Sequence, residues 1–533
     1  MLPPTHFGGR PGRTTVDSIH LFSKFAHDAW AHPRERYVSA LFLDVKAAFP
    51  SVVIQKLLHN MRMRGLPPEY IGWYKRRLMG RRTTLTFDDF TSKPFLIPTG
   101  LDQGCPLSPI AFLFYNAELI SLAEGKKDML GLGFIDDTAF LARGKTLEEA
   151  NGKLKNLMEK EGGALSWGER YEAEFELEKT ALICVTRGRE PDPTNRGKSI
   201  PVPRPGITVR GHRIEPQRSS KFLGIIIDEE LRFKDHAAYA ISKGTKYVLA
   251  SGRMSRTTKG VKGRMMKRLY EAVAIPKMLY AIDVWGTDLL RKGRGKREKG
   301  WGARGFAKQI NKVQCLAAIL VTGGMRTTAT DTLLAHADLL PTILMIRKHC
   351  HRAALRMTTL PTIHPIAKHT KSALRNRKRH KSPLHRLFGA FRIDAGSMET
   401  INPVQHHPKW KPKVIIDMAD DPADAILQDV RTETEDDVCI YSDGSGFEGK
   451  IGGAAVLRRG GEKKKTLKFH LGPESQHTVY EGEEVGMILA AELLCGENRH
   501  QEKQNFTIVP DILHSRCRAM SSAMTFGRLH SQR

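Results

Sequence analysis

The stretch that indicates the fold most clearly is Gly131-Leu-Gly-Phe-Ile-Asp-Asp-Thr-Ala-Phe-Leu-Ala142. Apolar residues flank two adjacent acids, Asp136 and Asp137, which is the pattern of a β-hairpin whose turn carries the acids. Taken alone, such a pair favours a plain turn, because Asp is a common turn residue. The two acids therefore gain a functional meaning only from other parts of the chain.

A third acid, Asp44, stands near the end of a second apolar run, Tyr37 to Val45, which is rich in strand-forming residues. A carboxylate at the end of a buried strand is costly unless it is paired or coordinates a metal ion. The alternative is that Asp44 caps the helix expected from Pro50 to Arg64.

A Gly- and Pro-rich loop, Pro98 to Pro109, lies between these two elements and leads into a helical pattern from Ile110 to Ala123. The order strand, helix, loop, helix, hairpin predicts an α+β domain. Helical periodicity returns at 146–161, 269–285 and 309–322, and short strands are expected within 207–227.

The composition favours a polyanionic partner. The 533 residues carry a formal net charge of +28, and each phosphate neutralised by a cation releases counterions. A solvated basic surface is the alternative for the charge as a whole, and a linker is the alternative for each basic stretch. The seven Cys show no tight metal-binding spacing. No apolar run is long enough to span a bilayer, so we expect an intracellular protein, cytoplasmic or nuclear, without a membrane partner.

Three segments in order resemble successive motifs of the reverse transcriptase palm. They are Phe42-Leu-Asp-Val-Lys-Ala-Ala-Phe49, Gly100-Leu-Asp-Gln-Gly-Cys-Pro-Leu-Ser-Pro109 and Phe134-Ile-Asp-Asp137. Phe175-Glu-Leu-Glu-Lys-Thr180 resembles the lysine-bearing motif of that family, and Lys221-Phe-Leu-Gly224 resembles its primer grip. The chain is therefore similar to reverse transcriptases of non-LTR (LINE-like) retrotransposons, in their fungal form.

The resemblance implies that Asp44 and Asp136 are the principal ligands of Mg²⁺ (or Mn²⁺), with Asp137 as the third acid of the palm. Two such ions together activate a primer 3′-hydroxyl and stabilise the leaving pyrophosphate. Lys179 would protonate that pyrophosphate or steady its charge. A solvated surface lysine is the alternative for Lys179.

The resemblance also implies substrate contacts. Phe49, five positions after Asp44, matches an aromatic gate against the ribose 2′-hydroxyl, with core packing as the alternative. Gln103 and Gly104 would line the nucleotide and template pocket, and Phe222, Leu223 and Gly224 would hold the primer. Arg10 or Arg13, in a segment that resembles part of the fingers, would hold phosphates through bidentate contacts, with a solvated Gly-rich turn as the alternative.

A second domain is expected near the C-terminus. Tyr441 to Gly446, Gly452 to Val456 and Val479 to Val485 resemble the opening of a ribonuclease H domain. By that match Asp443 and Glu483 are the first two metal ligands, and Asp511 is a candidate third. The residues after Ile512 lose the expected pattern, so a truncated domain is expected. The alternative for Asp443 is a turn aspartate.

The predicted fold class is therefore α+β: a right-hand polymerase palm with partial fingers and a helical thumb, followed by a truncated α/β ribonuclease H-like domain. The predicted boundaries are 1–235 for fingers and palm, 236–360 for the thumb, 361–434 for a basic and then acidic linker, and 435–533 for the last domain. The expected partners are an RNA template, a DNA primer or hybrid, and dNTPs.

Two rival hypotheses remain beside this RNA-directed DNA polymerase. One is a basic nucleic-acid-binding remnant that no longer polymerises, which incomplete fingers and a damaged last domain would favour. The other is a reverse transcriptase and maturase of the group II intron type, which the ribonuclease H-like segment from Asp443 argues against.

Overall fold

The computed structural model divides into two compact units, Met1–Val404 and Gln405–Arg533. Each unit has its own hydrophobic core. The structure describes residues 2–195, 197–254, 260–290, 304–373, 381–401, 414–417, 438–459, 462–497, 506–510 and 528–531.

A four-stranded antiparallel sheet is the centre of the first unit. Its strands, in spatial order, are β6 (Met129–Phe134), β7 (Asp137–Gly144), β1 (Tyr37–Leu43) and β8 (Ala181–Val185). Six of the seven residues of β1 are buried, because helices cover both faces of the sheet. A strand covered on both faces reads as a continuous apolar run, and the sequence predictions of β1 and of the β6–β7 hairpin are confirmed.

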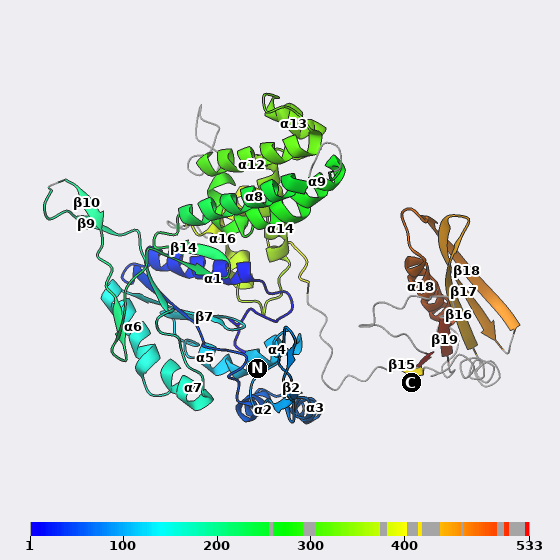
Figure 1. Cartoon of the computed structure of the whole chain (residues 1–533), viewed down its shortest axis with the longest axis horizontal. Coiled ribbons are helices and arrows are strands. Elements are labelled where there is room, and N and C mark those ends of the chain that lie inside the picture. Colours follow the sequence, from blue (N-terminus) through cyan, green and yellow to red (C-terminus); the bar gives the residue numbers. More distant parts are fainter. Residues whose placement is uncertain are drawn as a thin grey trace. The chain divides into compact units, whose positions relative to one another are not determined.

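Alternate residues of β1 belong to two separate cores. Val38, Ala40 and Phe42 pack in the core that includes α1 (Thr15–Ala31), whereas Leu41 and Leu43 pack in the other. Figure 1 shows α1 and α6 on opposite sides of this sheet. The second core draws on six helices: α2 (Ile54–Met63), α3 (Pro68–Leu78), α4 (Leu107–Tyr115), α5 (Ala117–Ser121), α6 (Leu147–Glu159) and α7 (Ala164–Tyr171).

Shorter elements complete this part of the unit. The strands pair as four hairpins or ribbons: β2 (Arg82–Thr83) with β5 (Phe95–Leu96), β3 (Thr86–Phe87) with β4 (Phe90–Thr91), β9 (Arg189–Pro191) with β10 (Ser199–Pro201), and β11 (Ile207–Val209) with β12 (His212–Ile214). A further hairpin joins β13 (Ser219–Phe222) to β14 (Ile225–Asp228).

Helices follow β14 and pack on the α1 side of the sheet, as the prediction of a helical segment after residue 236 requires. They are α8 (Lys234–Met254), α9 (Gly263–Leu269), the π-helical turn η1 (Tyr270–Ala274), α10 (Ile275–Met278), α11 (Ile282–Trp285), the 3₁₀ turn η2 (Thr287–Leu290), α12 (Arg304–Thr322), α13 (Thr330–His336) and α14 (Thr342–Thr358).

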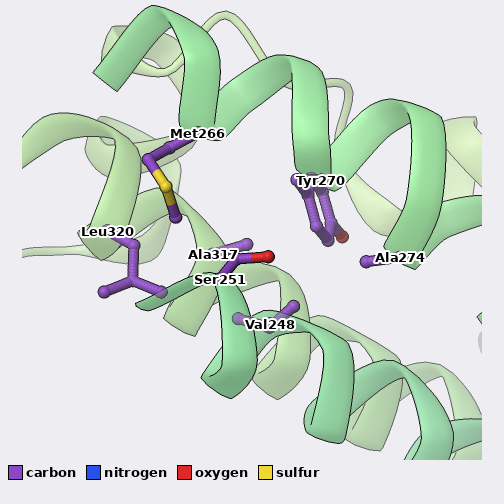
Figure 2. Close-up of a pocket in the computed structure, with 7 residues that line it drawn as sticks. All are labelled: Val248, Ser251, Met266, Tyr270, Ala274, Ala317 and Leu320. Carbon is purple, nitrogen blue, oxygen red and sulfur yellow. The ribbon is translucent and has the colours of Figure 1, made fainter. Parts of the chain in front are cut away.

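A small cavity lies among α8, α9, η1 and α12 (Figure 2). Its volume is about 10 Å³, and Val248, Met266, Ala317 and Leu320 are among the apolar side chains that line it. That volume is about one water molecule, so the cavity is a packing gap and not a ligand site.

The predicted linker is wrong at its N-terminal end. Residues 367–372 and 383–391 form helices α15 (Ala367–Ser372) and α16 (Pro383–Phe391). Leu384, Leu387 and Phe388 are fully buried in the α1-side core. Basic residues near these helices suggested a solvated linker, but the apolar face of α16 determines where the segment packs.

The second unit contains a six-stranded mixed sheet. Its order is β15 (Val414–Asp417), β20 (Arg528–Ser531), β19 (Phe506–Pro510), β16 (Val438–Phe447), β17 (Lys450–Arg459) and β18 (Glu462–Pro473). The pairing of β16 with β19 is parallel, and the other pairings are antiparallel. Helix α18 (Val479–Glu497) packs on this sheet through Leu489 and Leu493.

Glycines allow α18 to approach the sheet closely. A β-carbon at Gly444 would lie 2.0 Å from the backbone nitrogen of Glu483, and one at Gly453 would lie 2.6 Å from the carbonyl oxygen of Gly482.

Among the described helices of the chain, none is long and apolar enough to cross a membrane.

Candidate active site

Strand pairing brings the three predicted acids together. Leu43 lies opposite Thr138, so Asp44, the next residue, stands level with Asp137 at the end of the β1–β7 ladder. Phe134 pairs with Asp137, which leaves Ile135 and Asp136 as the two-residue turn of the β6–β7 hairpin. The register alone therefore gathers acids from two distant segments at one edge of the sheet.

The pKa of Asp137 reflects the proximity of the three acids. Burial raises its pKa, and repulsion from Asp136 and from Asp44 raises it further, to about 6. A neighbouring negative charge raises the pKa of a carboxyl group in this way. Divalent cations prefer such oxygen ligands, so the donor set fits Mg²⁺ or Mn²⁺.

The site is open and not enclosed. The side chain of Asp44 is 54% exposed, so the expectation of a buried carboxylate was wrong, and Asp136 is also exposed. Among the described residues, no group of three or more His, Cys, Asp or Glu side chains is arranged as a ready-made metal site. Mg²⁺ is commonly held by one or two carboxylates together with substrate phosphates and water, which is the type of site that these exposed acids suit.

Lys179 lies beside these acids. Its Nζ atom is 2.6 Å from Oε2 of Glu176 and 4.0 Å from Oδ2 of Asp44. The hydrogen bond to Glu176 raises the pKa of Lys179, and the charge of Asp44 adds to the effect. The loop that carries it is fixed to the end of β1, because the backbone N–H of Glu176 donates to the carbonyl of Asp44 at 3.0 Å.

The Gly- and Pro-rich loop from Pro98 to Pro109 packs against the residues that follow Asp44. Leu101 donates its backbone N–H to the carbonyl of Phe49 at 2.8 Å. Gly100 has a φ of +82°, and a β-carbon there would lie 2.6 Å from the carbonyl oxygen of Pro50, so only glycine fits. Phe49 itself is half-buried, with its ring centroid 5.4 Å from that of Phe112.

Arg81 holds the outer part of this loop. Its guanidinium donates to Oδ1 of Asp102 at 2.6 Å and to the carbonyls of Thr99 and Gly100 at 2.9 and 2.7 Å. Gln103 and Gly104 are exposed beyond that anchor. No local sequence pattern predicted this role of Arg81, because its partners lie about 20 residues further along the chain.

The two N-terminal arginines bond to their own segment. Arg10 donates to the carbonyl of Pro3 at 2.7 Å, and Arg13 donates to the carbonyls of Pro4 and His6. In this arrangement they stabilise the turn that precedes α1. Their contact with phosphates stays a prediction.

The segment that resembles the primer grip is a tight turn. Leu223 and Gly224 have φ values of +47° and +82°, as in a type I′ hairpin. Tyr280 donates its hydroxyl to the carbonyl of Leu223 at 2.9 Å, and its oxygen lies 2.6 Å from the hydroxyl of Thr15. Phe222 is 4% exposed and packs on Phe42, so its side chain belongs to the core. Contact of the turn with a primer stays a prediction.

The acids of the second unit lie on adjoining elements. Asp443 is an exposed residue of β16, and Glu483 lies in the first turns of α18, against Gly444. Strand alternation points Asp443 away from the face that Gly444 presents to α18. Asp511 lies outside the described residues.

Comparison with known families finds a match in the first part of the chain. Residues 1–227 match the family model of reverse transcriptase (RNA-dependent DNA polymerase). This range contains Asp44, Asp136, Asp137 and the loop from Pro98 to Pro109.

The relatives of the chain are mobile-element proteins. It is 25% identical over 363 residues to a probable RNA-directed DNA polymerase from transposon X-element of Drosophila melanogaster, covering 66% of this chain and 35% of the relative. It is 25% identical over 298 residues to the RNA-directed DNA polymerase from mobile element jockey of Drosophila funebris, covering 54% and 30%. The chain thus spans about a third of the length of these relatives.

Among solved structures, a telomerase from Candida tropicalis aligns with 68% of this chain and 53% of its own, at 13% identity and a TM-score of 0.32. A likeness at that score adds nothing to the assignment of the fold.

Proposed function

We propose that this protein is the RNA-directed DNA polymerase of a non-LTR retrotransposon, which extends a primer 3′-hydroxyl with dNTPs on an RNA template. The observation that carries the proposal is the register of β1 and β7, which sets Asp44 level with Asp137 and beside Asp136. The names of the relatives support the same activity. The fungal form of the resemblance stays a prediction.

The acids would act as the metal-binding group of a two-metal transfer. Bound Mg²⁺ supplies Lewis acidity toward the attacking hydroxyl and the leaving pyrophosphate. Asp44 and Asp136, both exposed, would bind those ions, and Asp137 would keep the local field negative. Lys179, 4.0 Å from Asp44, would donate a proton or a hydrogen bond to the departing pyrophosphate.

The residues around the acids would choose and place the substrates. Phe49 follows the strand that carries Asp44, and the loop docked on it presents Gln103 and Gly104 to solvent. We propose that Phe49 excludes the ribose 2′-hydroxyl, that the loop contacts the incoming nucleotide and the template, and that the turn at Leu223 and Gly224 contacts the primer.

Primer extension on an RNA template in Mg²⁺ tests the proposal, with wild type compared with Asp136→Asn. We expect the variant to lose at least about 100-fold in rate, which equals about 2.7 kcal/mol of transition-state stabilisation. Asp192→Asn is the matched control, because Asp192 is also an aspartate in a hairpin connection, between β9 and β10.

Equal extension by wild type and Asp136→Asn would refute the proposed site. An inactive wild type that binds RNA with a steep dependence on salt would support the alternative of a nucleic-acid-binding remnant.

For the second unit we propose a partial ribonuclease H-like domain in which Asp443 binds divalent metal. Glu483 stays a prediction as a second ligand, because strand alternation points Asp443 away from α18, the helix that carries Glu483. A mixed sheet with the parallel pair β16 and β19 and a covering helix α18 supports this assignment. Incubation of the chain with an RNA–DNA hybrid and Mn²⁺ tests it. Cleavage of the RNA that Asp443→Asn abolishes supports the assignment, and cleavage that this change leaves intact contradicts it.

A further inference from the structure

The turn that carries Asp136 has an unfavourable backbone. Ile135 has a φ of +61°, a left-handed conformation that is a genuine outlier for a β-branched residue. Such a conformation persists only where the surrounding structure holds it, and it concentrates at functional sites. The contacts that hold Ile135 therefore decide where the carboxylate of Asp136 lies.

Asn116 makes the polar contact to this turn. Its Nδ2 donates to the carbonyl oxygen of Ile135 at 2.5 Å, and its Oδ1 lies 3.0 Å from Nε2 of His6. Asn116 is 1% exposed and stands between α4 and α5, where it ends the first helix. Both ends of its amide are thus engaged, one by the turn and one by the N-terminal segment.

The N-terminal segment lies along β6 as an additional short strand. His6 forms a parallel bridge with Gly133, and Phe7 donates its backbone N–H to the carbonyl of Gly133 at 2.7 Å. A β-carbon at Gly8 would lie 2.6 Å from the backbone nitrogen of Ile135. This segment therefore packs directly against the turn, and it brings the ring of His6 to Asn116.

The hydrogen bond to His6 agrees with this orientation of the amide. Burial is the main cause that lowers the pKa of His6, to about 4, so the ring is neutral near pH 7. An amide oxygen only accepts, so the contact with Oδ1 of Asn116 requires the tautomer of His6 that carries its proton on Nε2. Nδ2 of Asn116 is then the group that donates to Ile135.

We propose that Asn116, oriented by His6, is a positioning residue that holds the Ile135–Asp136 turn in the geometry needed for metal binding by Asp136. This inference rests on the proposed function. It adds two residues from outside the acid-bearing segments, and neither of them touches the reacting groups.

The first test compares Asn116→Asp with wild type in steady-state primer extension. Asp keeps the acceptor for His6 but has no donor for Ile135. We expect kcat to fall by about 10- to 100-fold, as a misplaced catalytic group would cause, while KM for dNTP stays within about twofold. Asn151→Asp is the matched control, because Nδ2 of buried Asn151 donates to the carbonyl of Pro205, away from the acids, at 2.7 Å. An unchanged kcat in Asn116→Asp would overturn the proposal.

The second test does not depend on activity. Hydrogen exchange of the backbone amides at 133–138 is measured in the metal-free protein, together with Mn²⁺ binding by titration calorimetry. We expect exchange at least about tenfold faster and weaker Mn²⁺ binding in Asn116→Asp, but not in Asn151→Asp. Wild-type exchange and wild-type Mn²⁺ affinity in Asn116→Asp would overturn the proposal.

A conservative pair at His6 covers the case in which Asn116→Asp does not fold. His6→Gln retains a side-chain N–H for Asn116, whereas His6→Phe removes it. Recovery of slow exchange in His6→Gln relative to His6→Phe supports the proposal, and equal exchange in the two contradicts it. If wild type shows no polymerase activity, the proposed function fails, and the exchange comparison still decides the role of Asn116.

Discussion

At Asp137, burial and two neighbouring carboxylates act in the same direction and raise the pKa to about 6. The charges of Asp136 and Asp44 disfavour the charged form of Asp137, so this placement does not stabilise the Asp137 carboxylate in the folded chain. Perturbed titration of this kind is concentrated at functional sites. The arrangement therefore favours a role in binding cations over the plain turn that the sequence also allowed.

Phe49 offers a prediction about the choice of sugar. Its ring is half-buried against Phe112, so core packing and a gating role remain in competition. If Phe49 is the gate, Phe49→Ala should reduce discrimination against ribonucleotides by about 10- to 100-fold, measured as the ratio of kcat/KM for dNTP and rNTP. Ile71→Ala, in the same core, is the control for lost packing. Unchanged discrimination in Phe49→Ala, with a melting temperature lowered as in the control, would leave Phe49 as a core residue.

The local patterns of the sequence predicted the residues that carry the chemistry but not those that support them. Asp44, Asp136 and Asp137 follow from strand periodicity and turn chemistry, which act over a few residues. Asn116, Arg81 and Tyr280 act through contacts with backbone carbonyls elsewhere in the chain. Such contacts exist only after the chain has folded, and Asn, Arg and Tyr side chains also occur on protein surfaces.

At the scale of elements, the turn between β13 and β14 depends on a residue from the helical segment. Tyr280 bonds to the carbonyl of Leu223 and to the hydroxyl of Thr15 at the start of α1. One phenol therefore connects three elements.

Removal of that hydroxyl should loosen the turn. We expect Tyr280→Phe to raise the Kd for a primer–template duplex by about fivefold, because two half-buried polar groups lose their partner. Tyr270→Phe is a close control, since the hydroxyl of Tyr270 is buried and has no hydrogen-bond partner among the residues that the structure describes. Filter binding at fixed ionic strength measures both. An equal Kd for Tyr280→Phe and Tyr270→Phe would exclude a role for the turn in holding the primer.

The secondary structure was predicted best where one element shows a strong pattern. The apolar run of β1 and the hairpin of β6 and β7 were evident, and Thr146 caps α6 as the periodicity from 146 suggested. Helices α15 and α16 were missed, because a high density of basic residues around them dominates the local composition. Their apolar residues face a core built from α1 and the later helices, and the sequence alone did not reveal that surface.

At the scale of the whole molecule, an ion pair with a buried carboxylate connects α1, near the start of the first unit, to α14. Asp17 in α1 is fully buried and pairs with Arg356 of α14, and His364 lies 3.5 Å away. Burial alone would raise the pKa of Asp17, but the interactions with His364 and Arg356 outweigh it and lower the pKa to about 2.

Asp17→Asn should therefore destabilise the protein in a pH-dependent way. The folded-state pKa lies below the unfolded value of about 3.9, so the charge of Asp17 stabilises the fold above pH 4, and that contribution is lost as the pH falls to 2. We expect the variant to lose about 2 kcal/mol at pH 7, because a neutral amide replaces a buried carboxylate that pairs with Arg356 and lies close to His364. Urea unfolding at pH 7 and pH 3 measures the difference. A deficit as large at pH 3 as at pH 7 would argue against this linkage.

We propose that Asp44, Asp136 and Asp137 form one divalent-metal site. Crystals of the protein soaked with Mn²⁺ and dNTP, measured at a wavelength where manganese scatters anomalously, test for that site. We expect an anomalous peak about 2.0–2.3 Å from carboxylate oxygens of Asp44 and Asp136, with no such peak in Asp136→Asn. An ordered nucleotide beside these acids with no manganese within reach of either carboxylate would contradict it.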